Sequence, residues 1–319
     1  NEEKDMTFNP RIYADDKFIL QSEFRQAYQK SNLIADFSYN HDGKNTNTHF
    51  FTKISGELDS KTTFDFKFQD VTNDNYLKLH NLSNSSPLIQ DESLLTSHLN
   101  FDRRIDEKTN LDADFTVYED LSKIDSDRFQ YILPNITFVK DLEISKAYDG
   151  NFRFTSNAYQ KNYDTNKYEV LINNDFLFES NDKISKSGLL SEYNFLLKNY
   201  NSYIDKPTDS SEKSDHEIYG SLLLKTSYPL KKITDSSQNF LKPIIAARYS
   251  PNNTKNISDK DLRINYDNIF SFNRIGTTDM VEGGRSISLG LEYEKRNIDD
   301  RKIFGFNIAN SLTDRKRHG

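Results

Sequence analysis

Apolar and polar residues alternate with a period of two along most of this chain of 319 residues. In the segment 18–28, most of the even positions are apolar, with Ser22 and Gln26 as exceptions, and polar residues such as Glu23 and Arg25 lie at the positions between them. Successive side chains of a β-strand point to opposite faces, so this pattern predicts a strand with one apolar and one polar face. The segment 33–39 repeats the pattern after the short connection 29–32, which is typical of a β-hairpin.

The same alternation recurs to the end of the chain and predicts many antiparallel strands. Full charges stand in the middle of the polar faces, as at Asp114. A closed sandwich core does not tolerate such charges, whereas the water-filled lumen of a barrel does. The predicted fold is therefore all-β, a large antiparallel transmembrane β-barrel. The further segments with this pattern are 64–68, 95–101, 111–117, 152–158, 193–197, 218–224, 287–293 and 304–308.

Turn-forming residues separate these segments. Asp, Asn and Gly gather at 42–43, 149–151, 252–253 and 282–284, where they predict tight turns. Two longer polar stretches, 81–92 and 201–215, are predicted to be extended loops. Neither a domain boundary nor a short internal repeat is evident, so residues 1–319 are predicted to be part of a single transmembrane β-barrel domain.

Composition changes this picture little. A hydrophobic content of 35%, a charged content of 29% and a mean hydropathy of -0.81 would suit a soluble or partly disordered chain. The 23 Phe and 18 Tyr residues argue against disorder. No run approaches the ~20 apolar residues of a membrane-spanning helix, which excludes a helical membrane protein. The net charge of -7 weighs against nucleic acid as a partner, and the absence of cysteine excludes disulfides and thiolate metal sites.

Candidate catalytic chemistry is sparse. The carboxylate pair Asp112 and Asp114 is one of many, and we interpret these acids as solvated residues of loops or of the lumen. The sequence contains no nucleophile elbow, phosphate-binding glycine loop or dinucleotide fingerprint, so we expect no enzyme activity and no cofactor. The basic stretch 315–318 is interpreted as part of a loop or turn. No pair of histidines has zinc-ligand spacing, and solvated or lumen-facing positions are expected for His41, His49, His80, His98, His216 and His318.

Three collinear blocks carry a family resemblance. The first is 6–13 (MTFNPRIY) followed by 20–25 (LQSEFR). The second is 118–121 (YEDL) followed by 126–134 (SDRFQYILP), and the third is 265–274 (NYDNIFSFNR) with 281–284 (VEGG). In this order the blocks resemble the barrel of the LptD (OstA) family of lipopolysaccharide-assembly proteins, in a form similar to that of alphaproteobacteria.

The resemblance implies a very large barrel in the outer membrane of a Gram-negative bacterium, with a periplasmic jelly roll before it. In this family, lipopolysaccharide arrives through a periplasmic bridge protein, and its sugars cross the lumen to a lateral opening between the first and last strands. The expected function is non-enzymatic insertion of lipopolysaccharide into the outer leaflet. The expected partners are lipopolysaccharide, a plug lipoprotein inside the barrel, the bridge protein and the lipids of the outer membrane.

This sequence departs from the family pattern in two respects. It lacks the jelly roll and the closing strands, so a fragment of the barrel, open as it stands, is expected. It also lacks the cysteines that couple the two domains in some members. Without a nucleotide-binding motif, the energy for transport must come from elsewhere.

The resemblance also implies site residues. In the family a proline on an early strand weakens the pairing at the seam, and Pro10 matches it. Proline donates no hydrogen bond to a ladder and belongs beside an edge or opening, although a plain strand-start role would explain it equally well. Polar residues of the inward face are expected to line the hydrated path or to touch the plug; the candidates are Glu23, Arg25, Asp112 and Asp114.

Two other functions are compatible with the same strands. A general porin or uptake barrel would lack the three blocks and would carry its own closing strands. A secreted soluble β-sandwich, with carbohydrate-binding or hydrolytic activity, would need apolar rather than charged residues at its inward positions.

Overall fold

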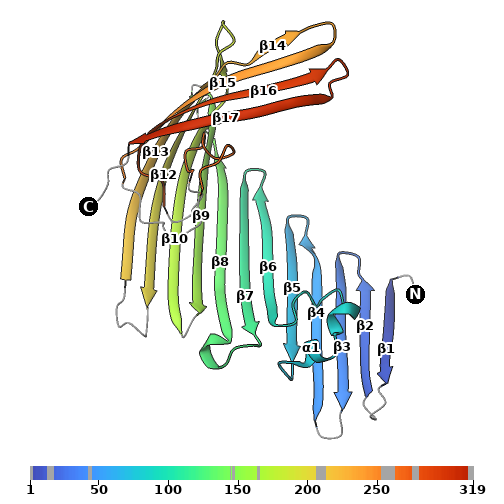
Figure 1. The fold of residues 1–319 in the computed structure, drawn as a ribbon. Coiled ribbons are helices and arrows are strands. Elements are labelled where there is room, and N and C mark those ends of the chain that lie inside the picture. Colours follow the sequence, from blue (N-terminus) through green and yellow to red (C-terminus); the bar gives the residue numbers. More distant parts are fainter. Residues whose placement is uncertain are drawn as a thin grey trace. The chain divides into compact units, whose positions relative to one another are not determined.

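The computed structural model describes residues 3–12, 18–41, 45–143, 145, 148–163, 166–205, 213–252, 263–274 and 280–314. Within these ranges, 17 strands belong to one sheet, and helical elements are few and short (Figure 1). The prediction of an all-β fold built from one large antiparallel sheet is confirmed, and a sheet of this size fits a large β-barrel. Among the described residues, no helix has the length and apolar character needed to cross a membrane.

The elements follow one another along the chain as β1 (Lys4–Ile12), β2 (Phe18–Ala27), β3 (Ser31–His41), β4 (Thr46–Asp59), β5 (Thr62–Val71), α1 (Tyr76–Leu79), η1 (Leu82–Ser85), β6 (Leu94–Asp106), β7 (Thr109–Asp120), η2 (Asp125–Asp127), β8 (Phe129–Leu142), β9 (Gly150–Tyr163), β10 (Lys167–Ser180), β11 (Lys183–Ile184), β12 (Leu190–Asp205), β13 (Lys213–Ser227), β14 (Leu230–Ile233), β15 (Ser237–Ser250), β16 (Gly284–Asn297) and β17 (Lys302–Asp314).

By its internal contacts the chain divides into two compact units. Unit 1 comprises Asn1–Val139, Ser156–Ile172 and Ser202–Ser214. Unit 2 comprises Lys140–Thr155, Asn173–Asn201 and Asp215–Gly319. Each unit is described by itself below, and the single barrel domain predicted over 1–319 stays a prediction.

In unit 1, β1 to β7 pair in sequence order as an antiparallel meander (Figure 1). The register sets one apolar row, in which Phe24 pairs with Ala35, Ala35 with Thr52 and Thr52 with Phe68. The next row lies on the opposite face and is more polar, with Glu23 paired to Asp36 and Asp36 to Phe51. The predicted two-faced strands are therefore present here.

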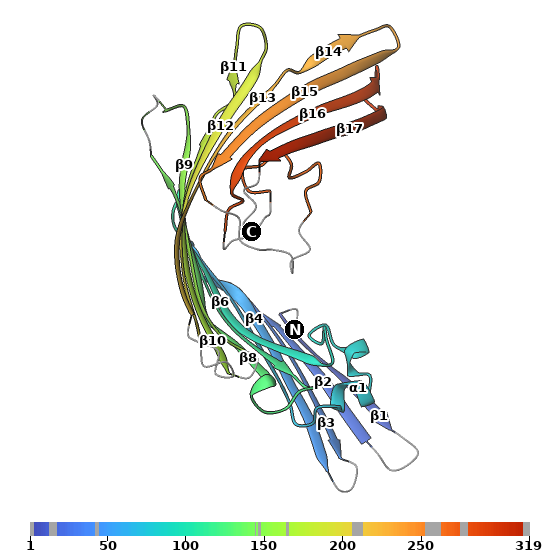
Figure 2. The same cartoon turned by 60° about the vertical axis from the view of Figure 1, so that its left-hand side comes forward.

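The connection between β5 and β6, residues 72–93, folds over the polar face of unit 1 and is called the cap segment below. Figure 2 shows α1, which belongs to it, on one side of the strands β2 to β4. Part of this segment, 81–92, was predicted to be an extended loop, and it does lie in a long connection between strands, with η1 as its one helical turn among these residues. The sequence did not predict that this loop packs on the sheet. Most apolar residues of the cap segment are buried because they pack on apolar positions of the sheet, whereas Leu79 is exposed. The members of this core are Ile19, Phe51, Tyr76, Leu77, Leu82, Leu88, Ile89, Leu95 and Leu121.

Leu95 departs from the predicted alternation, which placed it on the same face as Leu99 and Phe101. It is buried in the core beneath the cap segment. The ladder between β5 and β6 ends at Lys67 and His98. Beyond that point the side chain of Gln69 accepts a hydrogen bond from the backbone of Thr96 at 2.7 Å, which replaces regular strand pairing.

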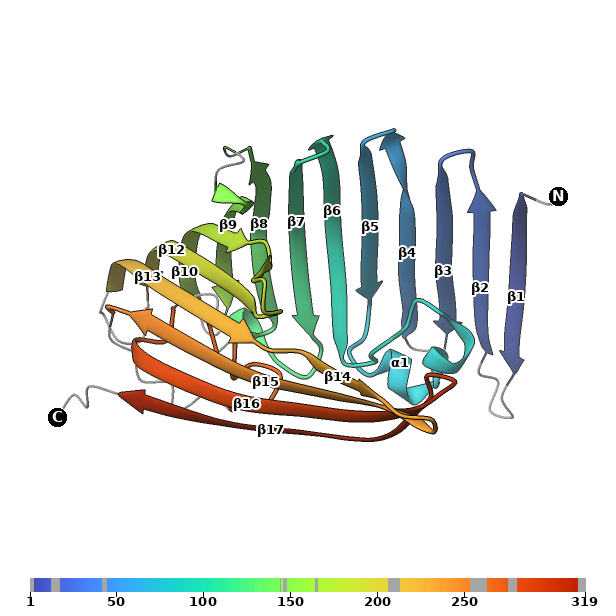
Figure 3. The same cartoon turned by 90° about the horizontal axis from the view of Figure 1, so that it is seen from above.

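In unit 2, β13, β15, β16 and β17 pair in that order, and β14 pairs with β15 near the start of that strand (Figure 3). One row crosses all four strands through Leu224, Ala247, Ile287 and Leu312. Its leucine and isoleucine side chains are about half exposed or more. The adjacent row, on the other face, runs through Leu223, Arg248, Ser286 and Thr313.

Several predictions on connections can be checked only in part. The predicted loop 201–215 is shorter than expected, because β12 continues to Asp205 and β13 begins at Lys213. Asp149, at a predicted turn, has a left-handed backbone with φ of 46°, which Asp tolerates better than most residues. Outside the described residues lie Tyr13 of the first sequence block, the turn at 42–43, Asn253, the loop centre 206–212 and the basic end with His318.

Candidate functional site

A segment between β15 and β16 covers the polar face of unit 2. Its described parts are residues 263–274 and 280–283, which carry the third sequence block. Local hydrogen bonds fold the first part: the side chain of Asn265 accepts from the backbone of Asp267 at 3.0 Å, and the side chain of Asn268 donates to the carbonyl of Arg263 at 2.9 Å. Such Asn-centred turns explain why this asparagine-rich stretch is compact without being a strand.

The ring of Phe270 packs against Gly290 of β16 and fixes this segment on the sheet. A Cβ atom added at Gly290 would lie 2.3 Å from the Cζ atom of Phe270, so only glycine leaves room for the ring. Next to it, the Ser288 hydroxyl donates to the carbonyl of Ile269 at 3.1 Å. The ring and the hydroxyl hold the segment at one place on β16.

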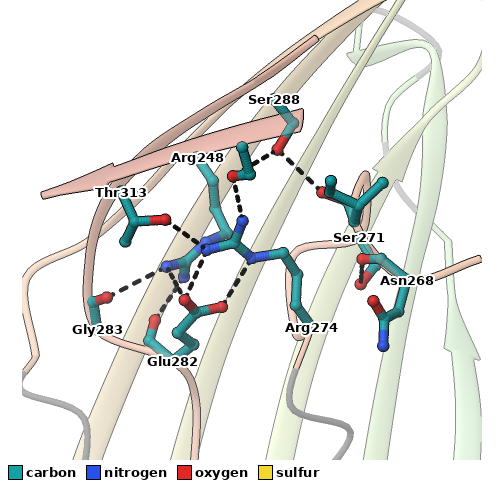
Figure 4. Close-up of polar contacts among 10 residues, drawn as sticks. Arg248, Asn268, Ser271, Arg274, Glu282, Gly283, Ser288 and Thr313 are labelled. Carbon is teal, nitrogen blue, oxygen red and sulfur yellow. Dashed lines mark hydrogen bonds and ion pairs between the residues drawn. The ribbon is translucent and has the colours of Figure 1, made fainter. Parts of the chain in front are cut away.

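Arg274 and Glu282 form a buried ion pair at the centre of the site (Figure 4). The Nε and Nη2 atoms of Arg274 donate to the two carboxylate oxygens of Glu282 at 2.8 and 2.6 Å. Nη1 of the same guanidinium donates to the Ser311 hydroxyl of β17 at 2.6 Å. Both charged side chains are 1–2% exposed. A two-point arginine–carboxylate contact is among the strongest charge-assisted hydrogen bonds in proteins, and here it links two residues of the covering segment. The hydrogen bond from Nη1 of Arg274 to Ser311 joins this segment to the last described strand.

Arg248, on β15, completes the centre. Its guanidinium donates to the backbone carbonyls of Glu282 and Gly283, the latter at 3.2 Å (Figure 4). Its Nη2 atom lies 3.6 Å from the Glu282 carboxylate, an ion contact longer than that of Arg274. We call Arg248, Arg274 and Glu282 the arginine–glutamate centre. It is an anchoring device, because it binds side chain and backbone of the covering segment to the strands on either side.

The sequence prediction missed this centre. Residues 282–284 were interpreted as a turn signal, and no role was assigned to Glu282 itself. Gly284 does have a left-handed backbone, with φ of 85°, at the start of β16. The sequence of β15 does contain a signal for this centre. The alternation places Arg248 on the same face as the apolar residues Ile244 and Ala246, where a charged residue needs a buried partner.

Tyr266 is a further contact of the covering segment. Its hydroxyl donates to a carboxylate oxygen of Glu292 at 2.7 Å. Burial, and then the hydrogen bond to this negative partner, raise the pKa of Tyr266 above its ordinary value. The hydroxyl therefore keeps its proton at any physiological pH and remains a donor to Glu292.

Unit 1 carries a second buried polar cluster, beneath the cap segment. The Ser38 hydroxyl lies 2.6 Å from Nδ1 of His49 and 2.8 Å from the hydroxyl of Tyr76. Nε2 of His49 lies 3.1 Å from the Asp36 carboxylate, without the geometry of a hydrogen bond. His49 is fully buried. It is therefore not solvated, as one of its two predicted positions required, because the cap segment places Tyr76 over it. That the face bearing His49 lines a lumen stays a prediction.

This cluster continues to the first strand of the chain. Gln21 donates to the Asp36 carboxylate at 3.3 Å and accepts from the Ser85 hydroxyl at 2.5 Å. Arg11 of β1 donates to the same Ser85 hydroxyl at 2.7 Å and to the carbonyl of His80 at 2.5 Å. The cap segment is thus held by side chains from β1, β2 and β3.

Arg128, from the second sequence block, holds the other side of the cap segment. It donates to the carboxylates of Glu119 at 2.7 Å and of Asp74 at 2.8 Å. The hydrogen bond to Asp74, with that to Glu119, raises the pKa of Arg128 against a smaller opposing effect of burial. Residues of the second and third sequence blocks therefore hold the segments that cover the sheet, the cap segment in unit 1 and the covering segment in unit 2.

The predicted site residues fall into two groups. Pro10 lies on β1, exposed, opposite Leu20 of β2. The register places Glu23, Arg25, Asp112 and Asp114 on one face of unit 1, the face that the cap segment partly covers. Glu23 and Arg25 contact each other at 2.5 Å, whereas Asp112 and Asp114 bond to Asn100 and Thr116. The gate and lumen roles of these residues stay predictions.

The comparisons with known proteins give no family. No protein-family model matches the sequence, and no curated protein does. Among solved structures, the chain is similar to the ferric citrate transporter FecA in the unliganded form, with a TM-score of 0.30 and 9% sequence identity. The match covers 98% of this chain and 60% of that chain, so this chain spans less than two thirds of FecA. At this TM-score the likeness carries no argument about function.

Metal binding finds no support in the part of the chain that the structure describes. No group of three or more His, Cys, Asp or Glu side chains there is arranged to hold a metal ion.

Replacing Tyr76 by phenylalanine is expected to lower the free energy of unfolding of unit 1 by about 0.5–1.5 kcal/mol, since it removes one hydrogen bond to Ser38 and keeps the buried ring. Urea unfolding followed by far-ultraviolet circular dichroism measures the difference. Tyr28→Phe, at an exposed position of the same unit, is the control. An unchanged midpoint for Tyr76→Phe would show that the hydroxyl contributes nothing.

Proposed function

We propose that this chain is part of an outer-membrane β-barrel that inserts lipopolysaccharide into the outer leaflet without an enzymatic step. The observation that carries the membrane assignment is the two-sided sheet of unit 2. Leu224, Ile287 and Leu312 expose apolar side chains in one row across β13, β16 and β17. Contiguous exposed apolar surface of this kind is unusual in soluble proteins and is the normal outer face of a transmembrane barrel.

The opposite faces support the barrel over a soluble sandwich. In unit 1, one face bears Asp36, Lys53, Asp65 and His98, which pair with one another or with neighbouring polar groups. A sandwich packs these faces together as its apolar core, whereas a barrel turns them toward water or toward segments folded into the lumen. The exposed apolar and covered polar faces of this chain follow the second arrangement.

The lipopolysaccharide substrate rests on the three sequence blocks that resemble the LptD family. Arg128, Arg274 and Glu282 of the second and third blocks anchor the covering segments, so the block residues have a structural reason to be present. From the same resemblance we take the partners: a plug lipoprotein within the lumen, a periplasmic bridge protein, lipopolysaccharide and outer-membrane lipid. A general porin or uptake barrel is the second candidate, because the two-sided sheet serves it equally well.

Depletion of the full-length protein in its own host separates these two functions. If the protein assembles lipopolysaccharide, depletion removes lipopolysaccharide from the cell surface and leaves it in the inner membrane. Normal surface lipopolysaccharide, together with slower uptake of small solutes, would support the porin instead.

Pro10→Ala tests the proposed gate. Alanine restores a backbone N–H donor on β1, and one more ladder hydrogen bond is worth about 1 kcal/mol, so we expect about fivefold less lipopolysaccharide delivered to the surface. Surface lipopolysaccharide per molecule of barrel is the measurement. Pro243→Ala is the matched control, since Pro243 lies in β15 opposite Leu291 of β16. Equal effects of the two variants would argue against a special role of Pro10.

A further inference from the structure

Among the residues that the structure describes, three buried hydrogen-bond donors near the arginine–glutamate centre have no partner. They are Nε of Arg248 and the hydroxyls of Ser221 and Ser250, each in a residue exposed by 4% or less. A buried donor without a partner costs free energy, and proteins satisfy nearly all such groups with protein atoms, ordered water or an ion. Three such donors close together indicate that an ion or a small molecule binds between them.

The strand register brings these donors together. Arg248 and Ser250 are two residues apart on β15 and face the same side. Leu223 of β13 pairs with Arg248, and Ser221 lies two residues before Leu223 on that same side. Residues two apart on a strand are separated by about 7 Å and neighbouring strands by about 4.8 Å, so the long side chain of Arg248 and the two hydroxyls can reach one small group.

The charges around Arg248 indicate whether the group that occupies this place is an anion, a cation or neutral. Among the described residues, the charges that act on Arg248 are Glu282, of opposite sign, and Arg274, of like sign. Glu282 already gives both of its oxygens to Arg274. The next acid on this face of β16, Glu292, is engaged by Tyr266 and lies 3.5 Å from Lys242. Two arginines, which stay protonated in proteins, therefore share one carboxylate in a buried place, and an excess positive charge there is costly.

We propose that unit 2 binds a small inorganic anion between Arg248, Ser221 and Ser250. The anion accepts from Nε of Arg248 and from the two hydroxyls, and it balances the second arginine. A halide of the size of chloride needs the least space and accepts from donors in any direction. The site goes beyond the proposed transport function and does not depend on it. It would fix the covering segment on the sheet by completing the arginine–glutamate centre.

The test is the thermal unfolding of the whole chain in detergent micelles, in sodium chloride and in sodium gluconate at the same ionic strength. The unfolding temperature is expected to rise with chloride concentration and to saturate. Bromide should substitute for chloride and, in crystals, give an anomalous peak beside Nε of Arg248. An unfolding temperature that is the same in both salts, or bromide found only elsewhere, overturns the proposal.

The double variant Ser221→Ala/Ser250→Ala provides a signature that a purely structural role would not give. In gluconate it is expected to be at least as stable as the wild type, because it removes two buried donors that lack partners. In chloride the order reverses, with an apparent affinity for chloride at least about tenfold weaker, since a hydrogen bond to a charged group is worth about 1.5–3 kcal/mol. Ser236→Ala, at an exposed serine in the turn before β15, is the control and should follow the wild type.

A carboxylate of the chain could supply the missing charge instead. Asp279 stands in the sequence between Arg274 and Glu282, outside the described residues. Asp279→Asn should leave the chloride dependence unchanged if the anion comes from solution. Chloride binding by Asp279→Asn but not by the wild type would assign the charge to Asp279 and overturn the proposal.

Discussion

Glu282→Gln is expected to lower the free energy of unfolding of unit 2 by about 3–5 kcal/mol, because removing the one acid of a buried ion pair leaves its partners charged and uncompensated. Arg274 would lose a two-point contact, and Arg248 its nearest opposite charge. Glutamine keeps the shape of the side chain, so the loss reports charge rather than packing. Urea titration of the chain in detergent micelles, followed by circular dichroism of the strands, measures it; the chain has no tryptophan for fluorescence.

Glu179→Gln is the matched control for this measurement. Glu179 lies on β10, within unit 2, and is exposed. The same loss of charge there should change the free energy of unfolding by no more than about 0.5 kcal/mol. If the two variants unfold at the same urea concentration, the arginine–glutamate centre does not stabilise the fold.

Leu289→Arg is expected to destabilise the chain in a phospholipid bilayer by about 2–4 kcal/mol, because Leu289 lies near the middle of β16 on the exposed apolar face. In the proposed membrane orientation the side chain of Leu289 contacts lipid. An arginine at this position must lose its hydration or extend its guanidinium to the headgroup region of the bilayer. The measurement is the free energy of folding into phosphatidylcholine vesicles, from the urea dependence of the folded fraction.

Asn307→Arg supplies the comparison on the other face of the sheet. Asn307 of β17 pairs with Glu292, on the polar face, and is also exposed. An arginine there remains beside an acid and should cost little. A polar-face variant as damaging as Leu289→Arg, or a harmless Leu289→Arg, would contradict the membrane orientation of unit 2.

The sequence predicted the strands well because alternation is a local property. Rows such as Phe24, Ala35 and Phe68 follow from a period of two once hairpin pairing is assumed. The same reasoning placed Glu23 and Asp114 on polar faces, and the register assigns both to one face. Local patterns thus determined the fold class and the faces of the strands.

The covering segments were not predictable in this way. The cap segment and 263–283 are polar in composition and contain turn residues, so they were interpreted as loops or as isolated motifs. Their positions depend on few, distant contacts, such as Tyr76 with Ser38 and Phe270 with Gly290. Nothing in the local sequence of a loop indicates which face of a sheet will receive it. The buried histidine and the arginine–glutamate centre were missed for that reason.

The cap segment also bears on the order in which the chain folds. Its partners come from both sides along the sequence, from Arg11 and Gln21 before it to Leu121 and Arg128 after it. Every member of its apolar core and of its polar cluster lies before residue 129. Unit 1 therefore contains a nucleus that becomes complete as soon as the turn before β8 is present. Hairpins that would otherwise be marginal alone gain a shared core at that moment, so later strands can add to a template that is already closed on one face.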